Sequence, residues 1–151
     1  MIAAKRIARF LPPPSCTLVF LLSLIGYLVA AKPVFYNPDT PWHVAAGDFI
    51  RAHGIPASDP WSYTAGNHTW YELSWLWDVV ISWITQHGGM YGLYFFTAVT
   101  GAIVMATLAY TIKARGVVSE LYIGLTLLAV WYVLLYTVSP QPWMATLFFT
   151  I

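Results

Sequence analysis

The sequence predicts an all-α polytopic membrane protein with three full transmembrane helices, a truncated fourth, and interfacial helices in its first extracytoplasmic loop. Of the 151 residues, 59% are hydrophobic and 9% are charged, whereas a soluble domain carries about 25% charged residues. Long uncharged runs recur along the chain, which is the pattern of membrane-spanning helices. All four histidines, five of the six acidic residues and six of the eight tryptophans lie between Asp39 and Gly88. Polar chemistry confined to one loop between apolar segments indicates a functional site there.

The expected segments follow the apolar runs in order. The first run follows a basic cluster and three consecutive prolines, and the last run begins after Pro142. The predicted segments are a cytoplasmic N-terminus (1–15), transmembrane helix 1 (16–31), an extracytoplasmic loop (32–90), transmembrane helix 2 (91–112), a cytoplasmic loop (113–120), transmembrane helix 3 (121–138) and the start of transmembrane helix 4 (139–151).

The distribution of positive charge predicts the direction of these segments. Lys5, Arg6 and Arg9 place the N-terminus in the cytoplasm, and Lys113 and Arg115 place the connection between helices 2 and 3 there too. The loop 32–90 then faces the periplasm, so we expect a bacterial inner-membrane protein. A cleaved signal peptide ending near Ala31 is the alternative interpretation of the N-terminus.

Three further features limit the class of protein. The net charge of +1 provides no broad basic surface for nucleic acid. The single cysteine, Cys16, excludes a disulfide within the chain. The final stretch from Trp143 to Ile151 is shorter than the roughly 20 residues of a spanning helix, so we expect the chain to be the front part of a longer protein.

Two interfacial helices are expected within the loop. Thr40 suits the N-cap and Pro41 the first helical position of a helix that runs to His53 and stops at Gly54. A second helix is expected from about Leu73 to His87, closed by two glycines. Between them, 61–64 and 69–71 are β-prone and predict a small hairpin or an ordered loop.

A series of motifs follows through the loop: D-T-P-W-H from Asp39, D-P-W-S-Y-T from Asp59, Trp70, Trp75-Leu76 and Gly89. In this order they resemble the first extracytoplasmic loop of bacterial membrane proteins related to the GT-C glycosyltransferases, and the resemblance covers about residues 15–115. It implies a polytopic enzyme that uses lipid-phosphate-linked sugars and carries an acidic active-site residue in this loop. Members of the family are several times longer, and after the third span they often have Arg-Pro where this chain has Ser139-Pro140-Gln141-Pro142.

Sugar transfer to a hydroxyl needs a base and a group that stabilises the departing phosphate. Asp39 is the candidate catalytic base, and the resemblance also implies an acid here; the alternative is that Asp39 only favours the start of a helix. His43, four residues later, could orient Asp39 or contact phosphate, or be a hydrogen-bonded interfacial histidine. No metal site is predicted, although Asp39 and His43 could contribute to binding a divalent metal.

Four further residues are candidate substrate-binding groups: Trp42, Asp59, Trp70 and Glu72. A tryptophan can stack on a sugar ring, but it also favours the membrane interface. Asp59 before a proline also suits a turn, and Glu72 also suits a helix start. Asp78 interrupts an apolar helix face, so we expect it either to point into a cleft or to pair with Arg51.

The resulting prediction is part of a glycosyltransferase-like membrane protein that transfers sugar from a polyprenyl-phosphate donor to an acceptor hydroxyl. The expected partners are the lipid bilayer, that donor and a membrane protein partner. The alternative is a non-catalytic membrane module or assembly subunit that retains the loop. A transporter is less favoured, because its acids would lie within the spans.

Overall fold

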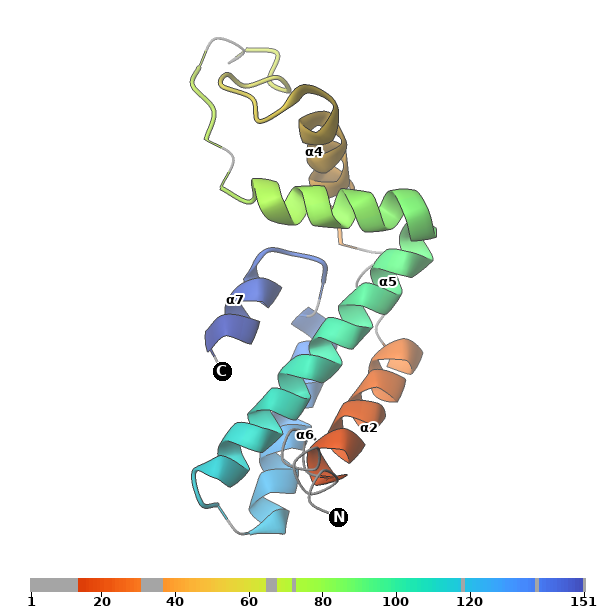
Figure 1. Ribbon diagram of the computed structural model, residues 1–151, viewed down its shortest axis with the longest axis vertical. Helices are drawn as coiled ribbons and strands as arrows, with labels where there is room; N and C mark the ends of the chain where they lie inside the picture. Colours follow the sequence, from red (N-terminus) through yellow and green to blue (C-terminus); the bar gives the residue numbers. More distant parts are fainter. Residues whose placement is uncertain are drawn as a thin grey trace, which may run out of the picture.

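The computed structural model describes residues 14–30, 37–64, 68–71, 73–117, 119–137 and 139–150. Five helices make up most of this part of the chain, and the predicted all-α class is confirmed (Figure 1). They are α2 (Pro14–Ala30), α4 (Asp39–His53), α5 (Trp75–Ala114), α6 (Glu120–Thr137) and α7 (Trp143–Thr150).

Helix α5 has two halves that meet at an elbow. Gly89 has a φ of 61° and a ψ of −166°, which breaks the helix between the halves. Residues with side chains rarely adopt such a positive φ, so glycine suits this position. The first half, from Trp75 to the elbow, lies across the long axis of the molecule, and the second half runs along it (Figure 1). The pair of glycines predicted to close the second interfacial helix therefore forms a bend in one longer helix.

The second half of α5 packs against α2, α6 and α7. Tyr27, Ala98, Met105 and Leu134 are among the buried side chains of this helical bundle. Gly101 lies under the ring of Tyr27, because a Cβ added there would stand 2.8 Å from the ring. The Tyr94 hydroxyl donates to the backbone carbonyl oxygen of Leu28 at 2.7 Å, which ties the elbow end of the bundle to the end of α2.

Among the described residues, α5 is the one helix long and apolar enough to cross a membrane. Its second half, of about 25 residues, extends roughly 37 Å at 1.5 Å per residue, against about 30 Å of hydrocarbon. The apolar stretches of α2 and α6, at Ser15–Val29 and Glu120–Leu135, are shorter. Three full spans, and the compartments assigned from the charges, therefore stay a prediction.

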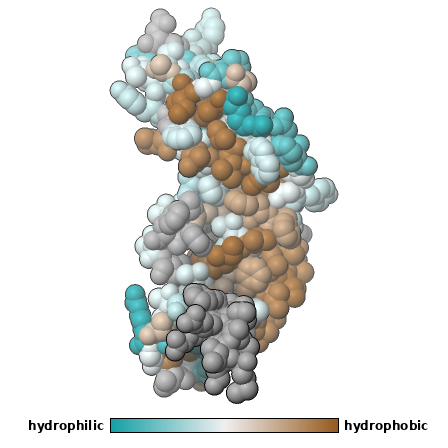
Figure 2. Space-filling model, viewed as in Figure 1, coloured by the Kyte–Doolittle hydropathy of each residue, from teal (hydrophilic) through white to brown (hydrophobic). Residues whose placement is uncertain are grey.

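Helix α4 packs on the first half of α5 at the opposite end of the molecule from the α5–α6 turn (Figure 1). The two helices approach closely at Gly47, where an added Cβ would lie 2.0 Å from the carbonyl oxygen of Asp78 and 2.6 Å from Cβ of Ser82. On the visible face, this end carries hydrophilic residues along one side and hydrophobic residues beside them, and hydrophobic residues cover much of the bundle (Figure 2).

The ends of α4 differ in part from the sequence prediction. The helix begins at Asp39, two residues before the Pro41 start that a Thr40 N-cap requires, and the Thr40 side chain is buried. The predicted N-cap is therefore wrong; the side-chain oxygen of Asn37 instead accepts a hydrogen bond from the Asp39 N–H at 2.8 Å. Gly54, with a φ of 84°, ends the helix as expected.

In its described parts, 54–64 and 68–71, the segment after α4 is a loop with one isolated antiparallel bridge, between Ser58 and Thr69. This pairing differs from the hairpin of 61–64 with 69–71, because Ser58 rather than a residue of 61–64 meets Thr69. The second helix begins at Trp75, two residues later than expected.

Candidate functional site

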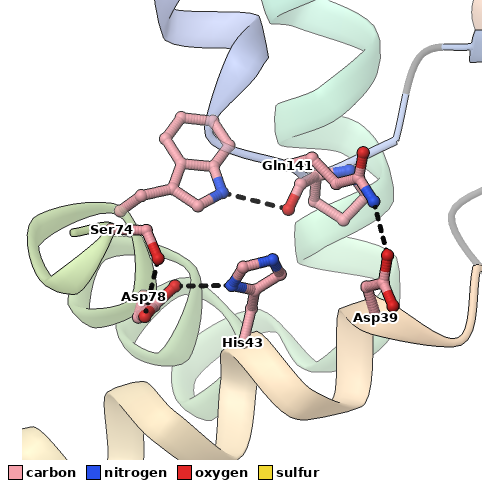
Figure 3. Close-up of polar contacts among 7 residues, drawn as sticks. Asp39, His43, Ser74, Asp78 and Gln141 are labelled. Carbon is pink, nitrogen blue, oxygen red and sulfur yellow. Dashed lines mark hydrogen bonds and ion pairs between the residues drawn. The ribbon is translucent and has the colours of Figure 1, made fainter. Parts of the chain in front are cut away.

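A buried acid and a histidine join α4 to α5. The Asp78 side chain is 1% exposed, and its Oδ1 lies 2.7 Å from Nδ1 of His43, which is 15% exposed. The Ser74 hydroxyl donates to the other carboxylate oxygen of Asp78 at 3.3 Å. Figure 3 shows the His43 ring directed from α4 toward Asp78 on α5. A buried carboxylate needs such partners, because an unpaired charge in a protein interior is strongly unfavourable.

This pair corrects the interpretation of Asp78. Asp78 does point between the helices, but its partner is His43 rather than Arg51. The Arg51 guanidinium instead donates to the Ser82 hydroxyl at 3.2 Å and to the Gln86 side-chain oxygen at 2.6 Å. The reason is the register of the two helices, because successive turns of α4 face successive turns of α5. His43 therefore faces Asp78, and Arg51, further along α4, faces the turns of α5 that follow Asp78.

Asp39 lies one turn before His43, at the start of α4, and is exposed. Its Oδ2 accepts a hydrogen bond from the side-chain amide of Gln141 at 2.9 Å (Figure 3). The Gln141 oxygen in turn accepts a hydrogen bond from the Trp143 indole at 2.6 Å. The carboxylate thus faces a neutral amide whose orientation is set by α7.

The four-residue segment 139–142, between α6 and α7, brings Gln141 to this place. Ser139 and Pro140 are buried, and the Trp77 indole donates to the carbonyl oxygen of Pro140 at 3.0 Å. In the family that the sequence resembles, an arginine–proline pair often stands at this point of the chain. Here the side chain next to the acid is glutamine, which orients a carboxylate but adds no positive charge.

Trp42 and Trp70 belong to an aromatic cluster centred on Trp61. The Trp61 ring centroid lies 5.0 Å from that of Trp42, 5.4 Å from that of Phe49 and 5.6 Å from that of Trp70, all in edge contact. Such contacts stabilise by about 0.5–1.5 kcal/mol each beyond burial. The cluster fastens the loop to α4, so these two tryptophans have a structural role that the sequence did not reveal.

Of the two remaining candidate acids, the structure describes Asp59. Asp59 Oδ1 accepts hydrogen bonds from the backbone N–H groups of Trp61 and Ser62 at 2.9 and 3.0 Å. This is the turn-forming role that was the alternative interpretation. Glu72 lies outside the described residues.

A protein-only metal site would need more ligands than Asp39 and His43. Within the described residues, no three His, Cys, Asp or Glu side chains form a group that could hold a metal ion. Of the predicted site residues, Asp39 and His43 lie together at the start of α4. Three residues outside the predicted site contact them directly or through each other: Ser74, Asp78 and Gln141. The resemblance pointed to the segment 139–142, but the contact of Gln141 with Asp39 could not be read from local motifs, because the two residues are 102 positions apart.

Comparison with protein-family models, curated proteins and solved structures finds no match to this chain. The function is therefore argued from the arrangement of these residues.

Proposed function

We propose that the chain contributes the Asp39 site of a membrane glycosyltransferase that moves a sugar from a polyprenyl-phosphate donor to an acceptor hydroxyl. The observation that carries the proposal is an exposed carboxylate at the start of α4, held by Gln141 and one turn from the His43–Asp78 pair. This site lies at the end of the molecule where α5 turns away from its long apolar half, where a lipid-linked donor would present its head group.

In the proposed reaction, the acceptor oxygen attacks the anomeric carbon of the donor sugar as the bond from that carbon to the phosphate oxygen breaks. The acceptor proton passes to the carboxylate of Asp39, and the polyprenyl phosphate leaves with the electron pair of the broken bond. The Gln141 amide orients Asp39, and Asp78 orients His43 across the helix interface. No oxidant or reductant is needed.

A non-catalytic membrane module is the second candidate, and one observation favours it. Gln141 provides no positive charge beside Asp39, although a departing phosphate is stabilised by cations. Arg51, a cation of this end of the molecule, is directed to Ser82 and Gln86. Under this hypothesis, the exposed Trp42 and the neighbouring loop contact a partner protein.

The test is a transfer assay in native membranes with a labelled polyprenyl-phosphate sugar. Asp39→Asn keeps an oxygen for the Gln141 amide but removes the base, and transfer should fall by about 10²–10⁴-fold. Glu120→Gln is the matched control, because Glu120 pairs with Lys113 at the other end of the molecule. Equal amounts of both variants in the membrane establish folding. Transfer by Asp39→Asn at the rate of the control would exclude Asp39 as the base and favour the module.

A further inference from the structure

A second polar site lies beside the same pair of helices, one to two turns further along each. An open pocket of about 430 Å³ is lined by residues of the C-terminal part of α4 and of the end of the first half of α5. Its walls include Val44, Asp48, Arg51, Ser82 and Gln86. Its volume is within the range of about 300–1,000 Å³ that is usual for small-molecule sites.

The polar groups of this pocket are held in place by one another. The Ser82 hydroxyl donates to Asp48 Oδ1 at 2.6 Å and accepts from the Arg51 guanidinium at 3.2 Å. Arg51 also donates to Gln86 Oε1 at 2.6 Å. Ser82 is buried and therefore fixes both charged side chains relative to α5. A ligand would meet groups already in position, which lowers the entropy lost on binding.

The charges of the pocket select the class of ligand. The charges of Asp48 and Arg51 cancel. A phosphate would be repelled by the Asp48 carboxylate, and an amine would be repelled by the Arg51 guanidinium. A carboxylate offers about four acceptor positions and a guanidinium five donors, and the network described above uses only some of them. A neutral molecule with several adjacent hydroxyls can donate to Asp48 and Gln86 and accept from Arg51.

We propose that this pocket binds one sugar unit of the donor or acceptor, with Asp48 and Arg51 as its principal contacts. The inference rests on the proposed function for the sugar being a substrate, but binding can be measured without transfer. Loss of transfer in Asp39→Asn and loss of sugar binding in an Asp48 variant are therefore separate results.

The experiment is saturation-transfer difference NMR on the full chain in lipid nanodiscs, with the methyl glycosides of glucose, galactose and mannose as probes. We expect at least one glycoside to bind, and Asp48→Asn to weaken it about tenfold or more, because a hydrogen bond to a charged group is lost. Asparagine can still accept the Ser82 hydrogen bond, so the helix contact is retained. Glu120→Gln serves as the carboxylate control, and Arg51→Gln tests the opposite charge.

Binding that is lost in both pocket variants and retained in the control supports the proposal. The absence of a signal from all three glycosides in the unaltered chain would overturn it, as would equal binding by Asp48→Asn and Glu120→Gln. Displacement of the glycoside by inorganic phosphate at comparable concentration would also overturn it, because the pocket would then be an anion site.

Discussion

Gly47 is the position at which a single methyl group should separate α4 from α5. Its added Cβ would stand 2.0 Å from the Asp78 carbonyl oxygen, 2.5 Å from the Asp78 carbonyl carbon and 2.6 Å from Cβ of Ser82. Two of these three atoms are backbone and cannot rotate away. An ordinary contact begins at 3.4 Å, so in Gly47→Ala the helices must move apart by roughly 1.4 Å, the difference between 3.4 and 2.0 Å.

This displacement is large compared with the amount by which the hydrogen bonds across the same interface can lengthen. The His43–Asp78 contact of 2.7 Å and the Ser82–Asp48 contact of 2.6 Å would both stretch beyond hydrogen-bonding range. Overpacking costs about 1–3 kcal/mol, and about 2–4 °C of melting temperature accompanies each kcal/mol at this chain length. We therefore expect Gly47→Ala to lower the melting temperature by several degrees.

The measurement is thermal unfolding of purified protein in detergent, followed by circular dichroism. Gly124→Ala is the matched control, because the same methyl group on α6 would meet no atom within 4 Å. Alanine is the better helix former, so the control should be unchanged or slightly more stable. The reasoning about the helix crossing would be refuted if Gly47→Ala melted at or above the temperature of Gly124→Ala.

Two more predictions concern the same end of the molecule. His43→Ala should lower the free energy of unfolding by about 1–3 kcal/mol, because it removes the contact with one oxygen of the buried Asp78 carboxylate. The loss should be smaller when the substitution is made in Asp78→Asn, and equal losses in chemical denaturation of the two backgrounds would argue against a coupled pair. Trp61→Leu removes three aromatic contacts and should speed hydrogen exchange of the loop after α4, whereas Trp83→Leu, at a 54% exposed position, should not; the same exchange rate in both variants would show that the aromatic cluster does not order the loop.

Much of the helical framework could be predicted because its signals are local. Gly54 ends α4 and Gly89 breaks α5, each with a positive φ that glycine adopts readily. The apolar runs likewise predict helices at α2, α6 and the second half of α5. Each of these features depends on residues within one or two turns of each other, so a single sequence is enough to reveal them.

The contacts of the candidate site depend instead on how the helices pack. The sequence singled out Asp39 and His43, and for Asp78 it predicted either a cleft or a pair with Arg51, because spacing alone does not show which turns of the two helices face each other. The close approach at Gly47 sets the register of α4 on α5 and thereby gives Asp78 to His43. Gln141 reaches Asp39 because α6 and α7 return to the same end of the bundle, which no pattern in the 39–88 region encodes.

The elbow at Gly89 sets the two halves of α5 at an angle to each other. The first half carries Asp78 and Ser82, and the second half is the long apolar part beside α2. Because of this angle, a rotation of the second half about its own axis moves the first half sideways, and α4 moves with it. Packing against α2, together with the hydrogen bond of the Tyr94 hydroxyl to the last turn of α2, holds the rotation of the second half of α5. The end that holds Asp39 is thus oriented by contacts made within the bundle, and one inserted residue between Gly89 and Tyr94 would turn it by about 100°.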